Sequence, residues 1–310
     1  MTLDDTQPVR IVRGAETRTP ARTKLSPLDD ARYRAPGDSR WLLDVFRYPH
    51  LLSMLMKKGT STRYYGSVIG WGWSYVKPAI QFFVYFFMIG IVLGVDRGIE
   101  NFPLYLFSGI ILLNFYNEAT KAATNSITAS SSLIKKIYLP RELFPVSAVG
   151  SAFIHFVPQL ILLVIVSWIY GVRMTTWMAP LYVLIALVIM LMFTLGLGLF
   201  FGAINVAFRD AKNIIDVLLM FAIWMSPVLY LHERMRDVLP AWIYQLYMVN
   251  PVSVSVELFH LSFWAPGVAE PSTPDFLLTN TIAGFGIALG TLLLGQVVFR
   301  KLEGDFAQNL

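Results

Sequence analysis

Long apolar runs without a single Asp, Glu, Lys or Arg recur along the chain after residue 70. These charge-free runs cover residues 79–95, 144–170, 177–208 and 276–299. Each is near or above the roughly 20 residues that a helix needs to cross the hydrocarbon core of a bilayer. The runs are continuous, whereas strands of a transmembrane barrel alternate apolar and polar residues. Because lipid offers the backbone no partners, the pattern predicts membrane-spanning helices.

The predicted fold is an all-α polytopic membrane protein with six transmembrane helices. Trp71 and Trp73 open the first span, as aromatic residues do at the membrane interface. The second span ends polar, at Asn117, Glu118 and Lys121. The spans are placed at residues 70–94, 102–122, 144–170, 178–207, 213–231 and 276–299.

The chain begins with a polar segment and an amphipathic one. Residues 1–38 are polar and lack the apolar core of a signal peptide, which predicts a disordered cytoplasmic tail. In residues 39–66, apolar side chains recur at helical spacing on both sides of Pro49, opposite Lys57 and Lys58. This pattern predicts an amphipathic interfacial helix on the inner leaflet, divided at Pro49 because proline breaks the helical ladder. A short helix packed on its neighbours would show the same pattern and stays an alternative.

Residues 238–266 are apolar but interrupted by proline. The residue before a proline is driven out of helical geometry, so two half-helices that join near Asn250 and Pro251 are predicted. Irregular backbone at membrane depth survives only inside protein or beside water, which indicates a re-entrant helical hairpin between spans five and six, entering from outside. Glu257 and His260 are costly in lipid and should face protein or water. An amphipathic hairpin on the surface is the alternative.

Lys and Arg near the span ends gather on one side of this topology, and the positive-inside rule assigns that side to the cytoplasm. The predicted outer side holds only Arg97, Arg173, Arg234 and Arg236. Both termini are therefore predicted to be cytoplasmic, with a transmembrane domain at 67–300 and a short cytoplasmic tail at 301–310. The inner side holds Lys57, Lys58, Arg63, Lys121, Lys135, Lys136, Arg141, Arg209, Lys212, Arg300 and Lys301.

Composition agrees with a membrane protein and excludes several kinds of site. The chain is 55% hydrophobic and 15% charged, against about 25% charged residues in ordinary soluble domains. The cytoplasmic bias of Lys and Arg accounts for the net charge of +5, so nucleic-acid binding is not expected. The sequence has no cysteine and its four histidines are scattered, so neither a disulfide framework nor a metal site is predicted.

Motifs for ATP hydrolysis and for catalysis are missing from the sequence. There is no GxxxxGK[ST] phosphate loop, no Gly-Lys pair and no Gly-x-Ser-x-Gly nucleophile elbow. Adjacent acidic residues occur only in the predicted tail, at residues 4–5 and 29–30. We therefore expect a transport protein without catalytic residues or a cofactor of its own, whose energy for uphill transport would come from a partner.

The segment between spans two and three is too polar to cross the membrane and too regular for a simple turn. Residues 124–145 carry an apolar stripe that includes Leu133 and Ile134, next to Lys135 and Lys136. This pattern predicts a short cytoplasmic helix, held between two spans, that could pass a partner's motion into the membrane. A loop helix resting on the bilayer is the alternative.

Several short motifs follow one another along the chain, namely RYYGSVIG at 63–70, YLPRELFP at 138–145, NVAFRD at 205–210, SPVLY at 226–230, Asn250-Pro251 and RKLE at 300–303. In their order and topological positions they resemble the permease subunits of ABC-2-type polysaccharide exporters, the Wzm/TagG-like group. The likeness covers nearly everything after residue 40, although each motif alone is weak. The aromatic-rich sequence and the extended tail look most like the actinobacterial members that export cell-wall galactan. The tail itself departs from the short versions typical of the group.

The resemblance implies a homodimeric permease that binds two copies of a separate ABC ATPase, which would hold ATP and Mg. It also implies export of a polysaccharide linked to a polyprenyl diphosphate, from the cytoplasm across the bacterial inner membrane. In this interpretation the short cytoplasmic helix is a coupling helix docked on the ATPase. The coupling residues would be Ser132, Leu133, Ile134, Lys135, Lys136, Ile137 and Tyr138.

A glycan on a lipid diphosphate calls for two kinds of contact. Aromatic rings stack on the apolar faces of sugars, and cations near the inner leaflet attract a diphosphate. Packing against lipid or a neighbouring helix is the alternative for each aromatic residue, and contact with anionic phospholipid is the alternative for each cation. The channel-lining candidates are Phe82, Phe83, Tyr85, Phe86, Tyr105, Phe115 and Tyr116, and the substrate-entrance candidates are Lys57, Lys58, Arg63 and Lys77.

Two other functions stay open at this point. An ABC-2 permease of the same superfamily could carry a drug or a simple lipid, although the motifs at 63–70 and 139–145 favour the glycan group. A lipid-linked-sugar flippase or a glycosyltransferase that works without an ATPase belongs to a different class. Its activity would persist in the purified chain alone.

Overall fold

The computed structural model describes residues 42–63, 66–136, 139–172, 178–269, 271–304 and 306, except for the side chains of residues 62 and 63. The predicted tail at 1–38 lies outside these residues, as does most of the predicted C-terminal tail. Over the described residues the chain forms helices, turns and loops and no β-strand, which confirms the predicted all-α fold.

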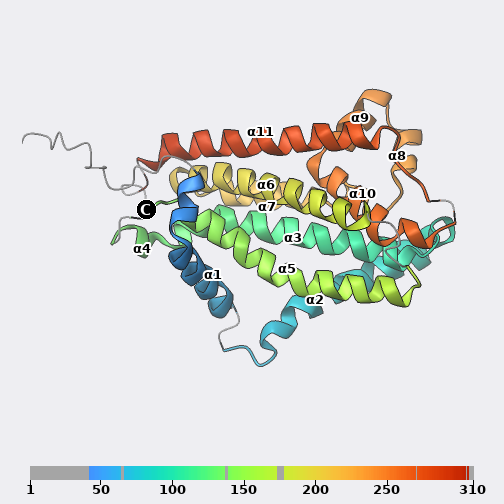
Figure 1. Ribbon diagram of the computed structural model, residues 1–310, viewed down its shortest axis with the longest axis horizontal. Coiled ribbons are helices and arrows are strands. Elements are labelled where there is room, and N and C mark those ends of the chain that lie inside the picture. Colours follow the sequence, from blue (N-terminus) through green and yellow to red (C-terminus); the bar gives the residue numbers. More distant parts are fainter. Residues whose placement is uncertain are drawn as a thin grey trace, which may run out of the picture. The chain divides into compact units, whose positions relative to one another are not determined.

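Four long helices run side by side and form the body of the protein (Figure 1). Helix α6 packs against both α11 and α3, and α3 also packs against α5. Leu104, Ile110 and Ile111 of α3 are fully buried, so α3 is the central helix. The four helices are α3 (Phe102–Ala129), α5 (Leu143–Ile169), α6 (Met178–Ala207) and α11 (Leu277–Glu303).

Four helical segments of the described chain are long and apolar enough to cross a membrane: Gly70–Val92, α5, α6 and α11. The first begins as the 3-10 turn η2 (Gly70–Gly72), continues as α2 (Trp73–Tyr85) and ends as the π-helix η3 (Phe86–Val92). Helix α3 has 28 residues, so it is about 42 Å long, but its second half is polar. Helix α7 (Ala211–Phe221) gives way to turns, so the fifth predicted span is α-helical only in its first half.

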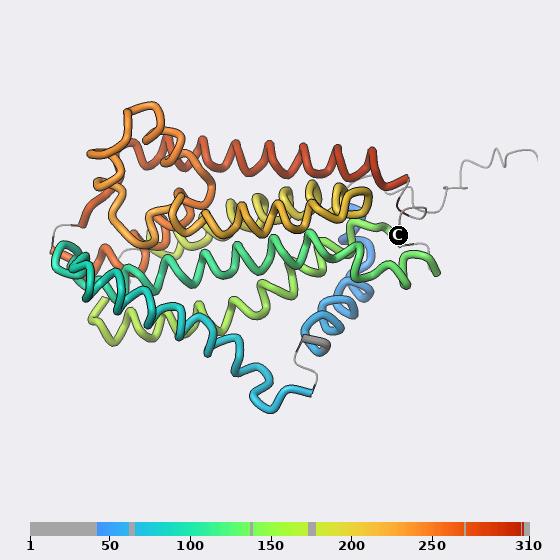
Figure 2. The backbone as a smooth tube through the Cα atoms, turned by 180° about the vertical axis from the view of Figure 1, so that it is seen from behind, coloured from blue at the N-terminus to red at the C-terminus, as the bar shows by residue number. Residues whose placement is uncertain are grey.

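The amphipathic region before the first span is divided as predicted. A 3-10 helix, η1 (Leu42–Arg47), is followed by α1 (Pro49–Arg63), which has Pro49 as its first residue. A proline at the first position of a helix loses no hydrogen bond, since that N–H has no intrahelical partner in any case. Helix α1 lies oblique to the long helices (Figure 2) and docks on α5, where Ser151 Oγ donates a hydrogen bond to the carbonyl of Met56 at 3.2 Å.

The second span is longer than its apolar stretch. Helix α3 continues to Ala129 although its predicted span ends at 122, so the first residues of the predicted cytoplasmic segment extend the span helix. The separate helix of that segment is α4 (Ser131–Ile134), only four residues long, followed by a turn at Lys135 and Lys136. Polar side chains do not stop a helix that lines a cavity, and this explains the difference.

The far end of the bundle carries the short helices η4 (Val95–Gly98), α8 (His232–Val238), α9 (Ala241–Val249), α10 (Pro251–Phe263) and η5 (Ala265–Gly267). The predicted division of residues 238–266 into separate helices at Asn250 and Pro251 is confirmed, because α9 ends and α10 begins there, while the re-entrant position of this segment in the membrane stays a prediction. Asn250 caps α10, since its Oδ1 accepts a hydrogen bond from the backbone N–H of Val252 at 3.1 Å. Helix α10 is buried almost throughout, between α3 and α6.

Candidate functional site

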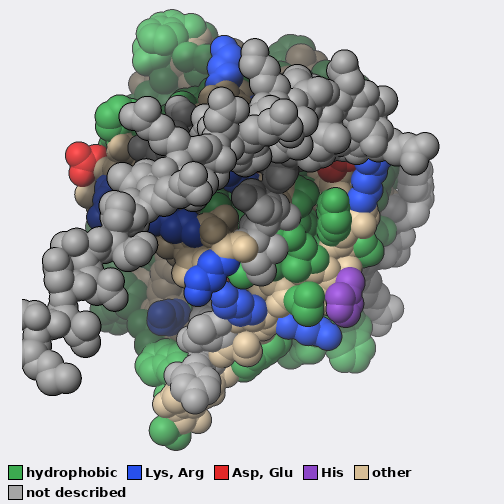
Figure 3. Space-filling view, turned by 90° about the vertical axis from the view of Figure 1, so that its left-hand side faces the viewer, with side chains coloured by type: hydrophobic (Ala, Val, Ile, Leu, Met, Phe, Trp, Pro, Cys, Tyr) green, Lys and Arg blue, Asp and Glu red, His purple; other side chains and the backbone are tan. Residues whose placement is uncertain are grey.

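Basic side chains cover one end of the bundle. They come from α1, from the turn after α4, from the α6–α7 connection and from the end of α11. Figure 3 looks onto this end and shows Lys and Arg side chains spread across it. The opposite end carries Arg97 in η4 and Arg234 and Arg236 in α8. Arg97, Arg234 and Arg236 of the predicted outer set are thus separated in space from the basic residues described at the first end (Figure 1).

The predicted coupling residues lie at this basic end. Ser132, Lys135 and Lys136 are exposed, whereas Leu133 and Ile134 are half-buried. Ile134 packs against a small core made by the ends of α3, α6 and α11. Ile137 and Tyr138 lie outside the described residues. The described part of the segment therefore offers an exposed polar face above an anchored apolar one.

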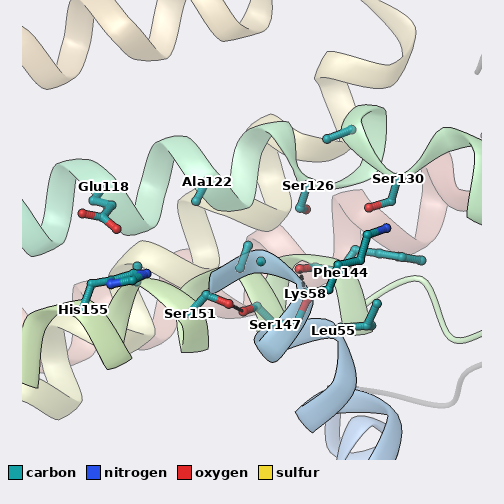
Figure 4. Close-up of a pocket in the computed structure, with 14 residues that line it drawn as sticks. Leu55, Lys58, Glu118, Ala122, Ser126, Ser130, Phe144, Ser147, Ser151 and His155 are labelled. Carbon is teal, nitrogen blue, oxygen red and sulfur yellow. Dashed lines mark hydrogen bonds between the residues drawn. The ribbon is translucent and has the colours of Figure 1, made fainter. Parts of the chain in front are cut away.

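A cavity of about 480 Å³ lies between α1, α3 and α5. Figure 4 shows Ser126 and Glu118 of α3 on one side, Ser147 and Ser151 of α5 on the other, and Lys58 of α1 in front. Serines spaced by four residues lie one above another on a helix, so α5 presents a hydroxyl row to this space. We call this space the serine cavity.

A second cavity of about 560 Å³ lies between α2 and α3 and reaches α5, and we call it the amide cavity. Asn114, Asn117, Glu118, Lys121 and Asn125 recur at intervals of three and four residues, so they form one polar face of α3. Polar side chains at membrane depth are costly unless they face protein or water, and the cavity provides that surface. Its lining is Trp73, Ser74, Lys77, Pro78, Gln81, Asn114, Asn117, Glu118, Lys121, Ala122, Asn125 and Gln159.

Two amide oxygens in the amide cavity have no hydrogen-bond donor among the described residues. They are Oδ1 of Asn117 and Oε1 of Gln159. The amide nitrogen of Gln159 is occupied, because it donates to the carbonyl of Ser74 at 3.1 Å. A buried acceptor without a donor costs about 1–3 kcal/mol. These oxygens therefore favour water or a hydroxyl-bearing ligand in the cavity.

The two cavities adjoin along α3, since Glu118 and Ala122 line both. Lys121, at the same level, forms an ion pair with Asp216 of α7 at 3.0 Å. The two cavities therefore form adjoining spaces, both partly polar in lining, beside the central helix of an otherwise apolar bundle.

The structure places the predicted substrate-entrance cations at different positions. Lys58 lines the serine cavity and Lys77 lines the amide cavity. Lys57 is exposed on α1 and lines neither cavity. Arg63 is the last residue of α1, and its side chain lies outside the described part.

The predicted channel-lining aromatics line neither cavity. Tyr105, Phe115 and Tyr116 are buried between helices of the same chain. Phe82 stacks on Phe86 with ring centroids 5.9 Å apart. The remaining two differ in exposure: Tyr85 is half-buried, and Phe83 is 65% exposed on the outer face of α2. In the described structure most of these seven rings therefore pack between helices of the same chain.

The ionisable residues of the predicted hairpin face protein, as their cost in lipid predicts. Glu257 Oε1 lies 3.4 Å from Nδ1 of His232, and both side chains are buried. His260 stacks on Tyr105 with ring centroids 3.8 Å apart. The hydroxyl of Tyr105 donates to the carbonyl of Pro227 at 2.6 Å, so Tyr105 ties α3 both to α10 and to the segment after α7.

Sequence reasoning did not find the amide cavity. Gln81 and Gln159 each stand alone in an apolar span, and the serines of α5 resemble ordinary small packing residues. The available signal was the spacing of Asn114, Asn117, Glu118 and Lys121, which Asn125 continues past the predicted end of the second span at 122. Within the described residues, no three His, Asp or Glu side chains are grouped so as to hold a metal ion.

The comparisons with known proteins point to one family. Residues 50–264 match the family model described as ABC-2 type transporter. The chain is 26% identical over 271 residues to the O-antigen export system permease protein RfbA of Myxococcus xanthus, covering 87% of this chain and 99% of that one. It is also 26% identical over 263 residues to the RfbA permease of Klebsiella pneumoniae, covering 84% and 95%. The polysialic acid transport protein KpsM of Escherichia coli is 22% identical over 246 residues, covering 78% and 89%. Helices able to span a membrane and a family match over most of the chain lead to one conclusion: the chain belongs to the ABC-2 type transporter family.

Proposed function

We propose that the chain is the permease subunit of an ATP-driven exporter that moves polyprenyl-diphosphate-linked polysaccharide from the cytoplasm across the bacterial inner membrane. The observation that carries this proposal is the amide cavity, a polar space beside the central helix of an apolar bundle. The names of the relatives support the cargo, because they are O-antigen and polysialic acid export proteins. A drug or a simple lipid would gain little from a wall of amide groups.

The chemistry of the amide cavity fits a sugar chain. Each amide side chain offers two donors and one acceptor oxygen, and sugar hydroxyls both donate and accept. Asn114, Asn117 and Gln159 can therefore exchange one hydroxyl for the next without leaving a group unpaired. The acceptors of Asn117 and Gln159 that lack donors in the described structure are free for this purpose. Uncharged amide groups also bind a sugar chain weakly enough to let it slide past them.

The two lysines on the cavity walls suit the diphosphate. Lys58 and Lys77 stand on α1 and α2, on either side of the shared wall at Glu118. Lys binds phosphate as a point charge on a flexible stem, and the inner leaflet is where the diphosphate of a lipid-linked glycan would arrive. We assign the diphosphate head group to the region of Lys58 and Lys77, and the sugar chain to the amide side chains of the amide cavity.

The energy for transport is assigned to a separate ABC ATPase, two copies of which would serve a homodimer of this chain. The exposed face at Ser132, Lys135 and Lys136 lies at the basic end of the bundle and provides a docking surface for it. ATP and Mg would be bound by that partner, and this chain would have neither a cofactor nor a catalytic residue. The topology proposed with this function has six spans, both termini in the cytoplasm and the α9–α10 pair as a hairpin re-entering from outside.

Transport in reconstituted vesicles tests the proposal. With its cognate ABC ATPase and ATP, the chain is expected to move a fluorescent oligosaccharide on polyprenyl diphosphate across the membrane. Without the ATPase, transport should fall to the leak of empty vesicles. Transport by the chain alone would favour an autonomous flippase, and transport limited to lipids without sugar would favour a lipid permease.

Removal of amide side chains from the amide cavity is expected to lower the transport rate more than the stability of the protein. The variants Asn117→Leu and Gln159→Leu should each reduce the transport rate about tenfold, since a lost hydrogen bond to a sliding hydroxyl leaves an unpaired group at about 1–3 kcal/mol. Asn213→Leu and Gln245→Leu replace exposed amides outside both cavities and serve as matched controls. If cavity variants and controls transport at equal rates and are equally stable to heat, the amide side chains of the amide cavity do not contact the glycan during transport.

A further inference from the structure

The segment that carries α4 is attached to more than the two helices it connects. Its covalent connections lead to α3 and α5, but Arg141 and Glu142, just before α5, contact the end of α11. We call the contacts of Arg141 and Glu142 with Gln296, Glu303 and Phe306 the α11 clamp. The clamp joins parts of the chain that lie more than 150 residues apart, as the sequence separations of 162 and 154 show.

Glu142 makes the buried half of the clamp. Its side chain is completely inaccessible, and its Oε1 accepts a hydrogen bond from Nε2 of Gln296 at 3.2 Å. Gln296 is itself 2% exposed. A buried carboxyl group needs hydrogen-bond partners to offset its lost hydration, so this contact fixes the start of α5 against α11 with a defined geometry.

Arg141 makes the second half, at the C-terminal end of α11. Its guanidinium donates to the main-chain carbonyl of Glu303 and lies over the ring of Phe306, with 5.6 Å from its central carbon to the ring centroid. Carbonyl groups in the last turn of a helix carry partial negative charge and attract cations. The ring adds a cation–π contact, which holds a planar guanidinium better than an ammonium group.

A small apolar core supports the clamp. Phe299 and Phe306 meet edge to face at 5.3 Å and are fully buried. They belong to a separate core with Val206 of α6, and Ile134 of α4 packs against this core. The end of α4 and the end of α11 are therefore held by apolar contact as well as by the hydrogen bonds of the clamp. In Figures 1 and 2, α4 and this end of α11 lie at the same end of the bundle.

Helix α11 is in turn packed closely on α6. A methyl group on Gly196 would lie 2.6 Å from the backbone nitrogen of Leu292, so the two backbones touch there. Packed interfaces of this kind move as units rather than deform continuously. A displacement of α4 would therefore reach the α6–α11 pair directly, without passing through the whole length of α3 or α5.

We propose that the α11 clamp positions the coupling segment and carries its movement into the α6–α11 pair. This inference rests on the proposed function, since it takes α4 as the site of ATPase docking. Arg141 and Glu142 act here as positioning residues, because they touch neither ATP nor the glycan. Their role is to make α4 and the end of α11 one rigid body.

Spin labels test the rigid body in the chain without its ATPase. The protein has no cysteine, so labels can be placed at residues 136 and 301, both exposed, with no background. In lipid nanodiscs, with the doubly labelled chain diluted in an excess of unlabelled chain so that a dimer carries one label pair, the parent should give one narrow 136–301 distance. Arg141→Met and Phe306→Ala should broaden that distribution, while Arg141→Lys, which keeps the charge and a donor, should retain most of its sharpness. Phe306→Ala removes the ring of the clamp and keeps the guanidinium, so it gives a second, independent answer if Arg141→Met folds poorly. A distribution as narrow in both variants as in the parent would overturn the clamp.

The functional consequence is measured in the complex with the ATPase. Arg141→Met and Phe306→Ala should still co-purify with the ATPase and hydrolyse ATP, but transport per ATP should fall about tenfold, within the usual range of coupling between sites. Lys135→Glu with Lys136→Glu alters the docking face instead and should weaken co-purification without unfolding the chain. A parent chain that binds no ATPase would defeat the proposed function, whereas the label distances would still decide for or against the clamp. Parent-like transport per ATP in both clamp variants would refute the coupling role.

Discussion

Alanine at Gly295 is expected to separate α6 from α11 and to destabilise the protein strongly. A methyl group on Gly295 would meet the backbone carbonyl of Gly196 at a distance that no real methyl group adopts. Because backbone rather than a flexible side chain stands in the way, one of the two helices must shift. Overpacking of a tight core costs about 1–3 kcal/mol, and a clash between two backbones belongs at the upper end of this range.

The same helix provides the matched control. Gly290 lies on α11 with nothing within 4 Å of an added methyl group. Gly290→Ala should therefore leave the midpoint of thermal unfolding in detergent unchanged or raise it slightly, since alanine favours a helix more than glycine does. A Gly295→Ala protein as stable as Gly290→Ala would show that α6 and α11 do not touch at this level. Such a result would also weaken the path proposed from the α11 clamp into α6.

The apolar helices were the most predictable part of the fold. Stretches such as 144–170 and 178–207 contain no Asp, Glu, Lys or Arg, and helices α5 and α6 match them within one residue at each end. The pattern is reliable here because lipid or protein surrounds such a helix on all sides, and either environment selects the same residues. The division of the amphipathic region at Pro49 and of the hairpin at Asn250 and Pro251 was also predictable, because proline acts locally.

The boundary of α3 was less predictable. Hydropathy assigns polar residues to the end of a span, but Asn117 and Asn125 lie on a helix that continues to Ala129. A helix ends where its backbone hydrogen bonds end, and a polar face toward a cavity leaves those bonds intact. The amide cavity could not be predicted for a similar reason. Gln81, Asn117 and Gln159 come from three helices, and only the packing of those helices brings them together.

The aromatic residues show the limit of reasoning from residue type. Rings suited to sugar stacking are equally suited to helix packing, and the sequence contains no information on which face of α3 is enclosed. In the structure Phe115 packs on Phe156 with centroids 4.9 Å apart, and Tyr116 stacks on Phe193 at 5.9 Å. Both partners lie on helices remote in sequence. The partner of Glu257 was hidden in the same way, because His232 stands 25 residues earlier in a short helix that the sequence pattern did not indicate.

Loss of His232 is expected to destabilise the end of the bundle formed by α8 and α10 by about 1–3 kcal/mol, because removal of one side chain leaves a buried polar group of the other without its partner. Nδ1 of His232 and Oε1 of Glu257 are 3.4 Å apart, and the two side chains are only 3% and 5% exposed.

The variants His232→Leu and Glu257→Leu should each lower the free energy of unfolding in mixed micelles by this amount. The double variant should lose clearly less than the sum of the two, since each single change already abolishes the contact. Arg234→Leu, an exposed change on the same helix, should have little effect and serves as the control. Additive losses in the double variant would mean that the two side chains stabilise α8 and α10 separately, and that the contact between His232 and Glu257 does not couple the two helices.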